Sequence, residues 1–144
     1  MSESLSRPDR AVHHFRRVAI LFAGGPAPGA NAVISTAATS FMREGTEVIG
    51  MKHGYSSLAD YSPAKPLVEG RDYIRITPEF LKRTRSGQGI MIGTARTNPG
   101  KHVSHPSHLD DAERVQPLKN AYEGLRSLGV EALISIGGDD TLKT

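Results

Sequence analysis

The sequence Ala-Leu-Ile-Ser-Ile-Gly-Gly-Asp-Asp-Thr occupies residues 132–141. Its apolar run ends abruptly at two glycines, two carboxylates and a hydroxyl. This pattern predicts a buried strand of a parallel sheet that delivers a polar loop at its carboxyl end. Ligands of open α/β sheets bind at that edge. A plain strand-to-helix turn, in which the Asp residues only cap the helix, would show the same pattern.

A second glycine-rich loop follows the first apolar run of the chain, residues 17–22. Residues 23–31, Ala-Gly-Gly-Pro-Ala-Pro-Gly-Ala-Asn, lead into an Ala-rich helix predicted over residues 30–43. Pro28 is expected in the first turn of this helix and Gly45 after its end. Because a helix amino terminus offers unpaired N–H groups and a positive dipole end, this strand–loop–helix unit predicts an anion site.

The remaining pattern predicts strands over residues 46–51, 90–92 and 132–136, and a short helix that starts at Pro78 with Thr77 as its cap. Residues 56–71 show no period and are expected to be irregular. A long amphipathic helix is predicted over residues 109–128, and its apolar face would comprise Val115, Leu118, Tyr122, Leu125 and Leu128. Alternating strands and helices predict an α/β fold, a Rossmann-like parallel sheet with flanking helices. We expect this fold to be incomplete, because the chain stops where the next helix should begin.

Composition narrows the class of protein. The 144 residues suit one domain, and the net charge of +3 is too small to predict nucleic-acid binding. No apolar run approaches the roughly 20 residues that span a bilayer, so no membrane partner is expected. The chain contains no cysteine, which excludes disulfides and thiol catalysis and fits a cytoplasmic location. Residues 1–16 are expected to form a polar tail.

Three histidines, His102, His105 and His108, recur at three-residue steps. Pro106 interrupts any helix that would align them. A solvated loop is therefore favoured over a transition-metal site.

Three loops at predicted strand ends, residues 24–31, 93–96 and 137–141, together resemble the phosphofructokinase family, most closely its pyrophosphate-dependent branch. The resemblance extends from Val18 to Thr144. It implies the N-terminal, donor-phosphate-binding part of that fold, a domain of residues 17–144 truncated at its C-terminal end. The implied reaction is glycolytic transfer of a phosphoryl group from pyrophosphate or ATP to fructose 6-phosphate, giving fructose 1,6-bisphosphate. A homo-oligomer is implied for a full-length protein.

The resemblance assigns roles to residues of all three loops. Arg96 would be catalytic and would bridge the donor and acceptor phosphates, and Asp139 would hold Mg²⁺. Donor contacts are implied for Gly25, Tyr55, Gly138, Asp140 and Thr141. Gly25 would lie against the transferred phosphate, while Tyr55 matches an aromatic residue near the nucleotide of ATP-using members.

Two positions favour pyrophosphate over ATP. ATP-using members usually carry glycine at the position of Asp140, where a carboxylate adds bulk and negative charge in the path of the nucleotide's remaining phosphate. Pro26 replaces an acidic residue that is common in those members. Neutral drift at both positions is the alternative.

Two further functions stay open at this point. An NAD- or lipid-kinase-like enzyme would share the Gly-Gly-Asp loop but would lack the first glycine loop. A non-catalytic phosphate-binding or regulatory fragment is also possible. The family's catalytic aspartate lies in a Thr-x-Asp-x-Asp stretch that is not found in these 144 residues, so the fragment is expected to be inactive.

Overall fold

The computed structural model describes residues 9, 11–84 and 86–142, with the backbone alone at Asp140 and Leu142. Most of the predicted polar tail lies outside these residues. The strands are β1 (Arg17–Ala23), β2 (Glu47–Met51), β3 (Tyr73–Arg75) and β4 (Ala132–Gly137). The helices are α1 (Ala30–Arg43), α2 (Ser56–Ala59), α3 (Pro78–Thr84), the 3₁₀ helix η1 (Pro106–Asp110), α4 (Ala112–Ser127) and α5 (Asp139–Leu142).

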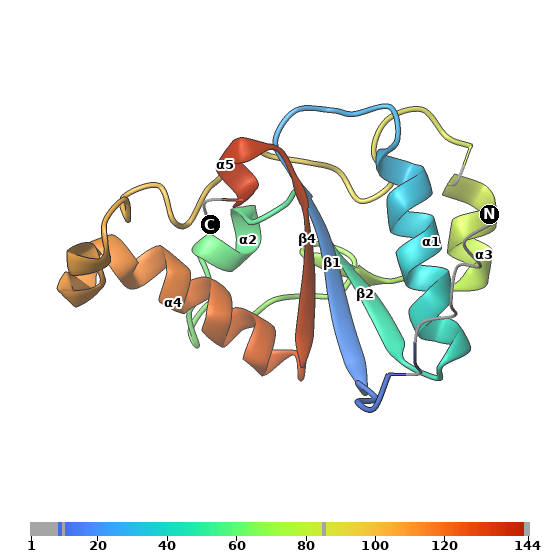
Figure 1. Ribbon diagram of the computed structural model, residues 1–144, viewed down its shortest axis with the longest axis horizontal. Helices are drawn as coiled ribbons and strands as arrows, with labels where there is room; N and C mark the ends of the chain where they lie inside the picture. The colour runs from blue at the N-terminus through green and yellow to red at the C-terminus, as the bar shows by residue number, and fades with distance from the viewer. Residues whose placement is uncertain (1–8, 10, 85, 143–144) are drawn as a thin grey trace, which may run out of the picture.

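The four strands form one sheet in the order β3-β2-β1-β4. β1 is parallel to both of its neighbours, and its register pairs Ala19 with Ile49 of β2 and with Leu133 of β4. β3 is antiparallel to β2 and was not predicted. The predicted parallel pairing of the three long strands is confirmed, and their carboxyl ends all lie at one edge of the sheet (Figure 1).

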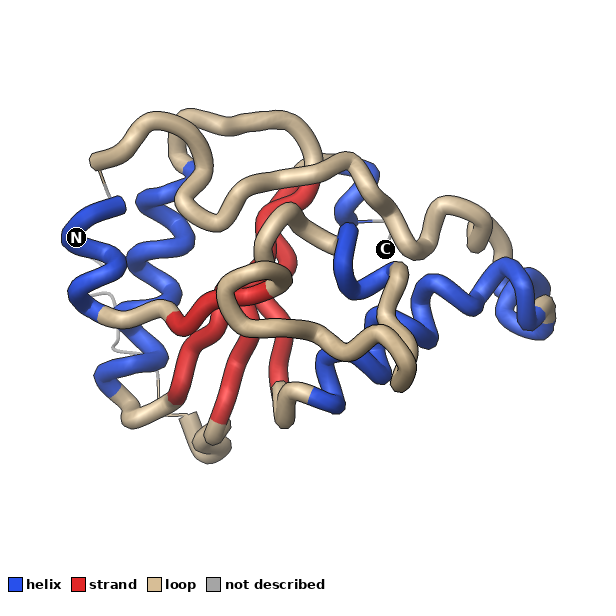
Figure 2. Tube along the Cα trace, turned by 180° about the vertical axis from the view of Figure 1, so that it is seen from behind, coloured by secondary structure: helices blue, strands red, loops and turns tan. Residues whose placement is uncertain are grey.

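Helices cover both faces of this sheet, so the fold has three layers (Figures 1 and 2). One apolar cluster joins α1, α3 and the 90–92 segment to one face of the sheet, with Val18, Ile20 and Ile34 at its centre. The other joins α2 and α4 to the opposite face through Leu21 and Leu58. This is the expected Rossmann-like arrangement, in which central strands are buried on both sides.

Local sequence explains most helix boundaries. Residues 30–43 form α1 as predicted, and Gly45 follows its end with a φ of +80°. Pro28, however, precedes the N-cap residue Gly29 and is not in the first turn. Thr77 caps α3 as predicted, accepting from the Phe80 N–H at 3.2 Å.

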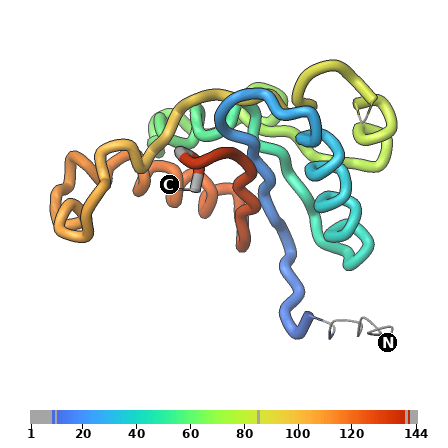
Figure 3. Tube along the Cα trace, turned by 45° about the horizontal axis from the view of Figure 1, so that its top comes forward, coloured from blue at the N-terminus to red at the C-terminus, as the bar shows by residue number. Residues whose placement is uncertain are grey.

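The predicted long helix over residues 109–128 is wrong in two respects. Asp111 separates η1 from α4, because its carboxylate accepts from the N–H groups of Glu113 and Arg114 and starts a new helix. Tyr122 is 62% exposed and does not join the apolar face; Ala121 and Gly124 are buried instead. η1 and the first turn of α4 extend away from the sheet (Figure 3).

β4 differs from the buried strand that its sequence predicts. It is the last strand in the sheet order, its Leu133 and Ile134 are only half-buried, and Ser135 is exposed. Among the described residues β4 pairs with β1 alone, so its other side is an open edge.

Candidate functional site

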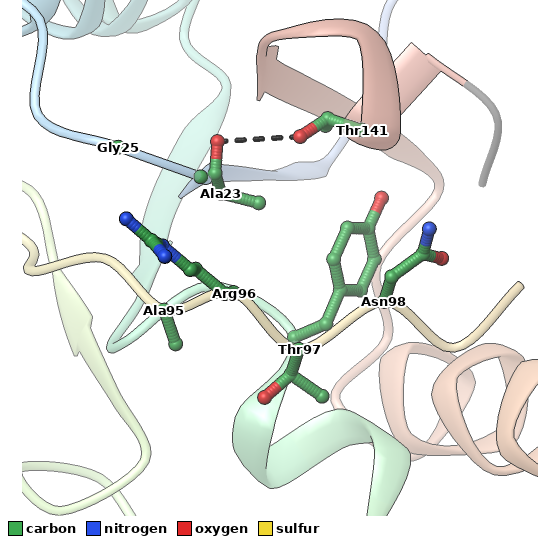
Figure 4. A pocket seen from close by; sticks show the side chains of 9 residues that line it. Ala23, Gly25, Ala95, Arg96, Thr97, Asn98 and Thr141 are labelled. Carbon is green, nitrogen blue, oxygen red and sulfur yellow. Dashed lines mark hydrogen bonds between the residues drawn. The ribbon is translucent and has the colours of Figure 1, made fainter. Parts of the chain in front are cut away.

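A pocket of about 190 Å³ lies at the carboxyl edge of the sheet. It is lined by Ala23, Gly24, Gly25, Tyr55, Ala95, Arg96, Thr97, Asn98 and Thr141 (Figure 4). These residues come from the end of β1 and the loop after it, from the turn between β2 and α2, from the segment around Arg96 and from α5. The structure thus brings together four predicted site residues that are distant in sequence, Gly25, Tyr55, Arg96 and Thr141.

The 93–98 loop is tied directly to the glycine loop after β1. The N–H of Gly24 donates to the Ala95 carbonyl at 2.9 Å, and the Thr94 hydroxyl donates to the Gly24 carbonyl at 2.6 Å. Arg96 follows immediately, exposed, and its side chain points toward the segment that carries Ala23 and Gly25 (Figure 4). The two hydrogen bonds therefore set where the guanidinium lies relative to the glycine loop.

Asn31, in the first turn of α1, holds the segment that leads into this loop. Its side-chain amide donates to the Gly89 carbonyl at 2.7 Å and its oxygen accepts from the Met91 N–H at 2.8 Å. This corrects the strand predicted over residues 90–92. The backbone there is a turn, in which the Gly93 N–H donates to the Ile90 carbonyl. The Met91 N–H bonds Asn31, and the Ile92 carbonyl accepts from the His53 N–H.

A tight turn after β2 packs against the same loop. His53 and Gly54 both have positive φ, 57° and 58°. A Cβ on Gly54 would lie 2.9 Å from the Phe22 carbonyl oxygen and 3.5 Å from the Ala95 nitrogen. Only glycine gives both the backbone angle and the close approach here, so this residue sets the spacing between β1, the turn and the arginine loop.

Tyr55 follows that turn and forms one wall of the pocket. It is only 6% exposed and packs in the apolar cluster on the α2/α4 face. Its hydroxyl lies 2.8 Å from the Ser135 hydroxyl of β4. The aromatic residue is thus fixed between two strand ends.

The β4–α5 connection closes the other side of the pocket. The Thr141 hydroxyl donates to the Ala23 carbonyl at 3.2 Å (Figure 4). A Cβ on Gly137 would collide with both groups. Gly137 is therefore needed to let α5 lie over β1. The hydroxyl proton of Thr141 is used here, so donation to a ligand oxygen would require it to change partner.

Asp139 is the first residue of α5 and is exposed. It and Gly138 lie at the same sheet edge but do not line the pocket, although the Gly138 nitrogen lies 3.9 Å from the position of a Cβ on Gly24. The Asp140 side chain lies outside the described part of the chain. Within that part, no cluster of three or more His, Cys, Asp or Glu side chains could bind a metal ion. A lone carboxylate still fits Mg²⁺, which is usually held by one or two carboxylates together with substrate phosphates.

The three histidines form no metal cluster in the described chain. His105 caps η1 through Ser107, and His108 accepts from the Ser104 N–H at 3.3 Å. The loop predicted here is corrected in part, because Pro106–Asp110 form a 3₁₀ helix. No helix among the described residues is long and apolar enough to cross a membrane.

Sequence reasoning did not single out Thr94 or Ser135, and it treated Asn31 only as the end of a loop. Ser135 carried a usable signal, since it is the one polar residue within an aliphatic strand, residues 132–136. Thr94 and Asn31 act through contacts with residues 58 to 70 positions away, which no local pattern encodes.

Comparison with known proteins agrees with this fold. The family model described as phosphofructokinase matches residues 17–144, and the chain belongs to the phosphofructokinase family. It is 34% identical over 127 residues to the pyrophosphate–fructose 6-phosphate 1-phosphotransferase of Thermotoga maritima, covering 87% of this chain and 25% of that protein. It is 38% identical over 126 residues to the ATP-dependent 6-phosphofructokinase of Aquifex aeolicus, covering 88% and 32%.

Solved structures show the same fold. Phosphofructokinase from Saccharomyces cerevisiae superimposes with a TM-score of 0.65 at 24% identity, over 88% of this chain and 14% of that one. Pichia pastoris phosphofructokinase in the T-state gives a TM-score of 0.64 at 24% identity, over 94% and 13%. The chain spans about a quarter to a third of the length of the two curated relatives above.

Proposed function

We propose that residues 17–144 form the donor-phosphate-binding domain of a 6-phosphofructokinase. The reaction would transfer a phosphoryl group to fructose 6-phosphate, giving fructose 1,6-bisphosphate. The observation that carries this proposal is the joining of Gly25, Arg96 and Thr141 around one pocket at the carboxyl edge of the sheet. An NAD- or lipid-kinase-like function is set aside because the family is phosphofructokinase.

The chemistry of phosphoryl transfer supports these roles. Such transfer depends on positioning and on stabilising charge at the equatorial oxygens, with little covalent participation by the protein. The planar guanidinium of Arg96 can donate two parallel hydrogen bonds to phosphate oxygens. Gly25 is exposed, and a Cβ on it would meet no atom within 4 Å, so the backbone there is open to a phosphate.

Mg²⁺ would be held by Asp139 together with donor oxygens. Bound there, the ion would supply charge neutralisation on the transferred group. Asp139 suits this role because its carboxylate is exposed at the edge where the phosphates would lie. Gly138 would allow the donor to approach the backbone, and Thr141 would bond donor oxygens once its hydroxyl leaves Ala23.

Pyrophosphate is favoured over ATP as the donor. The pocket of about 190 Å³ has room for phosphate groups. The resemblance to the family implies that a carboxylate at position 140 would add negative charge where further phosphates would pass. Tyr55 would be the wall beside the donor in either case. From the resemblance to the family we also propose a cytoplasmic location and a homo-oligomer for a longer polypeptide.

Equilibrium binding tests the proposal directly. The 144-residue chain is titrated with pyrophosphate and with ATP, each with Mg²⁺, in a calorimeter. Arg96→Ala should weaken pyrophosphate binding about tenfold to a hundredfold, the loss expected for hydrogen bonds to a charged group. Arg126→Ala is the matched control, because Arg126 stacks on Tyr122 of α4 and does not line the pocket. The proposal would be contradicted if the chain bound neither donor. It would also be contradicted if Arg96→Ala and Arg126→Ala weakened binding equally.

The same chain should not turn over fructose 6-phosphate. It has no Thr-x-Asp-x-Asp stretch, so it lacks the group expected to take the proton of the sugar hydroxyl. A coupled assay for fructose 1,6-bisphosphate on purified chain should show no product. Turnover that is lost in Arg96→Ala would show that the catalytic base lies within these residues.

A further inference from the structure

Ser135 interrupts an otherwise aliphatic strand, and its side chain has a defined partner. β4 has the sequence Ala-Leu-Ile-Ser-Ile-Gly, and alternate residues point to opposite faces of the sheet. Ala132, Ile134 and Ile136 pack on the α1/α3 side, and Leu133 packs on the α2/α4 side. Ser135 therefore shares the face on which Tyr55 is packed.

The buried phenol of Tyr55 needs a hydrogen-bond partner, because a buried hydroxyl without one costs free energy. Ser135 provides it across 80 positions of sequence, with 2.8 Å between the two hydroxyl oxygens. The ring is held at its other end by the backbone, since Tyr55 is the N-cap residue of α2 directly after the left-handed Gly54. Both ends of this side chain are therefore fixed.

The Tyr55–Ser135 pair also joins the two sides of the pocket. Tyr55 is a wall residue on the β2 side, while Ser135 lies on the strand that leads through Gly137 to Thr141 on the opposite side. The hydrogen bond between them is a direct contact between the β2–α2 turn and the strand that leads to the β4–α5 connection. Loss of that bond would let the wall move outward and widen the pocket.

We propose that Ser135 is a positioning residue that holds Tyr55 as a fixed wall of the pocket and so favours a short donor over a nucleotide. This inference rests on the proposed function for the choice of donor, but the pairing itself does not. A donor that lies wholly inside the pocket depends on the position of every wall. A nucleotide makes further contacts outside it and is less sensitive to a loosened wall.

Tyrosine spectroscopy tests the pairing independently of donors. The chain has four tyrosines and no tryptophan, so its near-ultraviolet circular dichroism reports tyrosines directly. The band that Tyr55→Phe removes identifies the Tyr55 signal. Ser135→Ala should reduce that band, Ser135→Thr should restore it, and Ser127→Ala should leave it unchanged. Ser127 is a suitable control because its hydroxyl makes one hydrogen bond at 2.7 Å, to Gly124 in α4, away from the pocket.

Donor binding tests the consequence. Ser135→Ala should weaken pyrophosphate binding about threefold to tenfold, the range that a net hydrogen bond supplies, and should change ATP binding less. Ser135→Thr should bind as the wild type does. The Tyr55→Phe/Ser135→Ala double variant should bind pyrophosphate no more weakly than whichever single variant binds it less tightly. The reason is that the two changes remove the same interaction.

The outcomes distinguish the positioning of Tyr55 by Ser135 from its effect on the choice of donor. A Tyr55 band that is unaffected by Ser135→Ala, or additive losses in the double variant, would overturn the positioning role. Equal weakening of both donors would overturn its effect on selectivity. Wild-type chain that binds neither donor would overturn the proposed function and the selectivity role together, while the spectroscopic result would still decide whether Ser135 positions Tyr55. Unfolding curves for each variant confirm that the fold is kept.

Discussion

The Thr94 hydroxyl donates to the Gly24 carbonyl at 2.6 Å and so fastens the arginine loop to the glycine loop. The two residues are 70 positions apart, and the same pair of loops is joined a second time by Gly24 and Ala95. Neither partner carries charge. The placement of Arg96 over the glycine loop therefore depends on neutral backbone and hydroxyl contacts and should change little with salt.

Removing this hydroxyl should loosen Arg96 without deleting it. Thr94→Val should lower the free energy of unfolding by about 1 kcal/mol and weaken pyrophosphate binding several-fold, because a carbonyl loses its donor. Chemical denaturation and calorimetric titration measure the two effects. Thr36→Val, at an exposed position of α1, is the control and should change neither. Unchanged affinity in Thr94→Val would show that the Gly24–Ala95 bond alone holds the loop.

Gly54 should tolerate alanine much less well than Gly70. Both have positive φ, 58° and 88°, so alanine costs about 1–2 kcal/mol in backbone strain at either position. A Cβ at Gly54 also meets the Phe22 carbonyl at 2.9 Å, whereas one at Gly70 meets nothing within 4 Å. Thermal unfolding should therefore show a clearly lower Tm for Gly54→Ala. Equal Tm values would mean that the turn can move away from β1.

Asp72 should make the free energy of unfolding depend on pH in the acid range. Hydrogen bonds from Arg71 lower the pKa of this carboxyl from 3.8 to about 2, against the opposing effect of burial and with further help from the Val68 N–H and the Ser57 hydroxyl. A pKa depressed by folding stabilises the folded state above the ordinary value, and that contribution is lost as the pH falls from about 4 to about 2. The loss should be on the order of 1–2 kcal/mol, since Arg71 is itself 61% exposed.

The measurement is the free energy of unfolding between pH 5 and pH 2. Asp72→Asn should be less stable than the wild type at pH 5, and its stability should fall less steeply toward pH 2. Parallel curves for the two proteins would assign the acid sensitivity to other carboxylates.

The two adjacent carboxylates of α5 should have separable effects on the donor. Asp140→Gly should raise binding of ATP relative to pyrophosphate by relieving crowding and repulsion. Asp139→Ala should instead weaken the Mg²⁺ complexes of both donors, because a metal ligand is lost. Titrations of the chain with each donor give the ratio of the two Kd values. In an active longer polypeptide, the ratio of the kcat/KM values for the two donors measures the selectivity. A ratio that Asp140→Gly leaves unchanged would remove the argument for pyrophosphate but not the family.

The sequence alone predicted the parallel strands well, because β1 and β2 are short apolar runs bounded by glycine-rich loops or helix ends. It missed β3, whose three residues are too few to show a period. It placed a strand at residues 90–92 because an apolar run of that length fits either a strand or a buried turn. Asn31 decides between them by binding the Met91 N–H, and that contact spans 60 positions.

Some residues of the candidate site could likewise be predicted from the sequence and others could not. Gly25 and Thr141 are recognisable because each belongs to a short motif that follows a strand, and Arg96 because it belongs to a short motif, although the segment before it is a turn and not a strand. Their supports, Thr94, Asn31 and Ser135, are ordinary polar residues whose importance depends on where the chain returns in space. Tyr122 was wrongly predicted to belong to the apolar face of the long helix. Its helical spacing fits that face, but its side chain is exposed.

The open side of β4 has a consequence for the behaviour of the chain at high concentration. Within the described residues, the strand over residues 132–137 pairs on one side only, and it contains no charged residue and no proline of the kind that normally protects a sheet edge. Such an edge is a template for a further strand from any chain that can supply one. Two copies that meet there would extend the sheet from one molecule into the next, so self-association should increase with concentration.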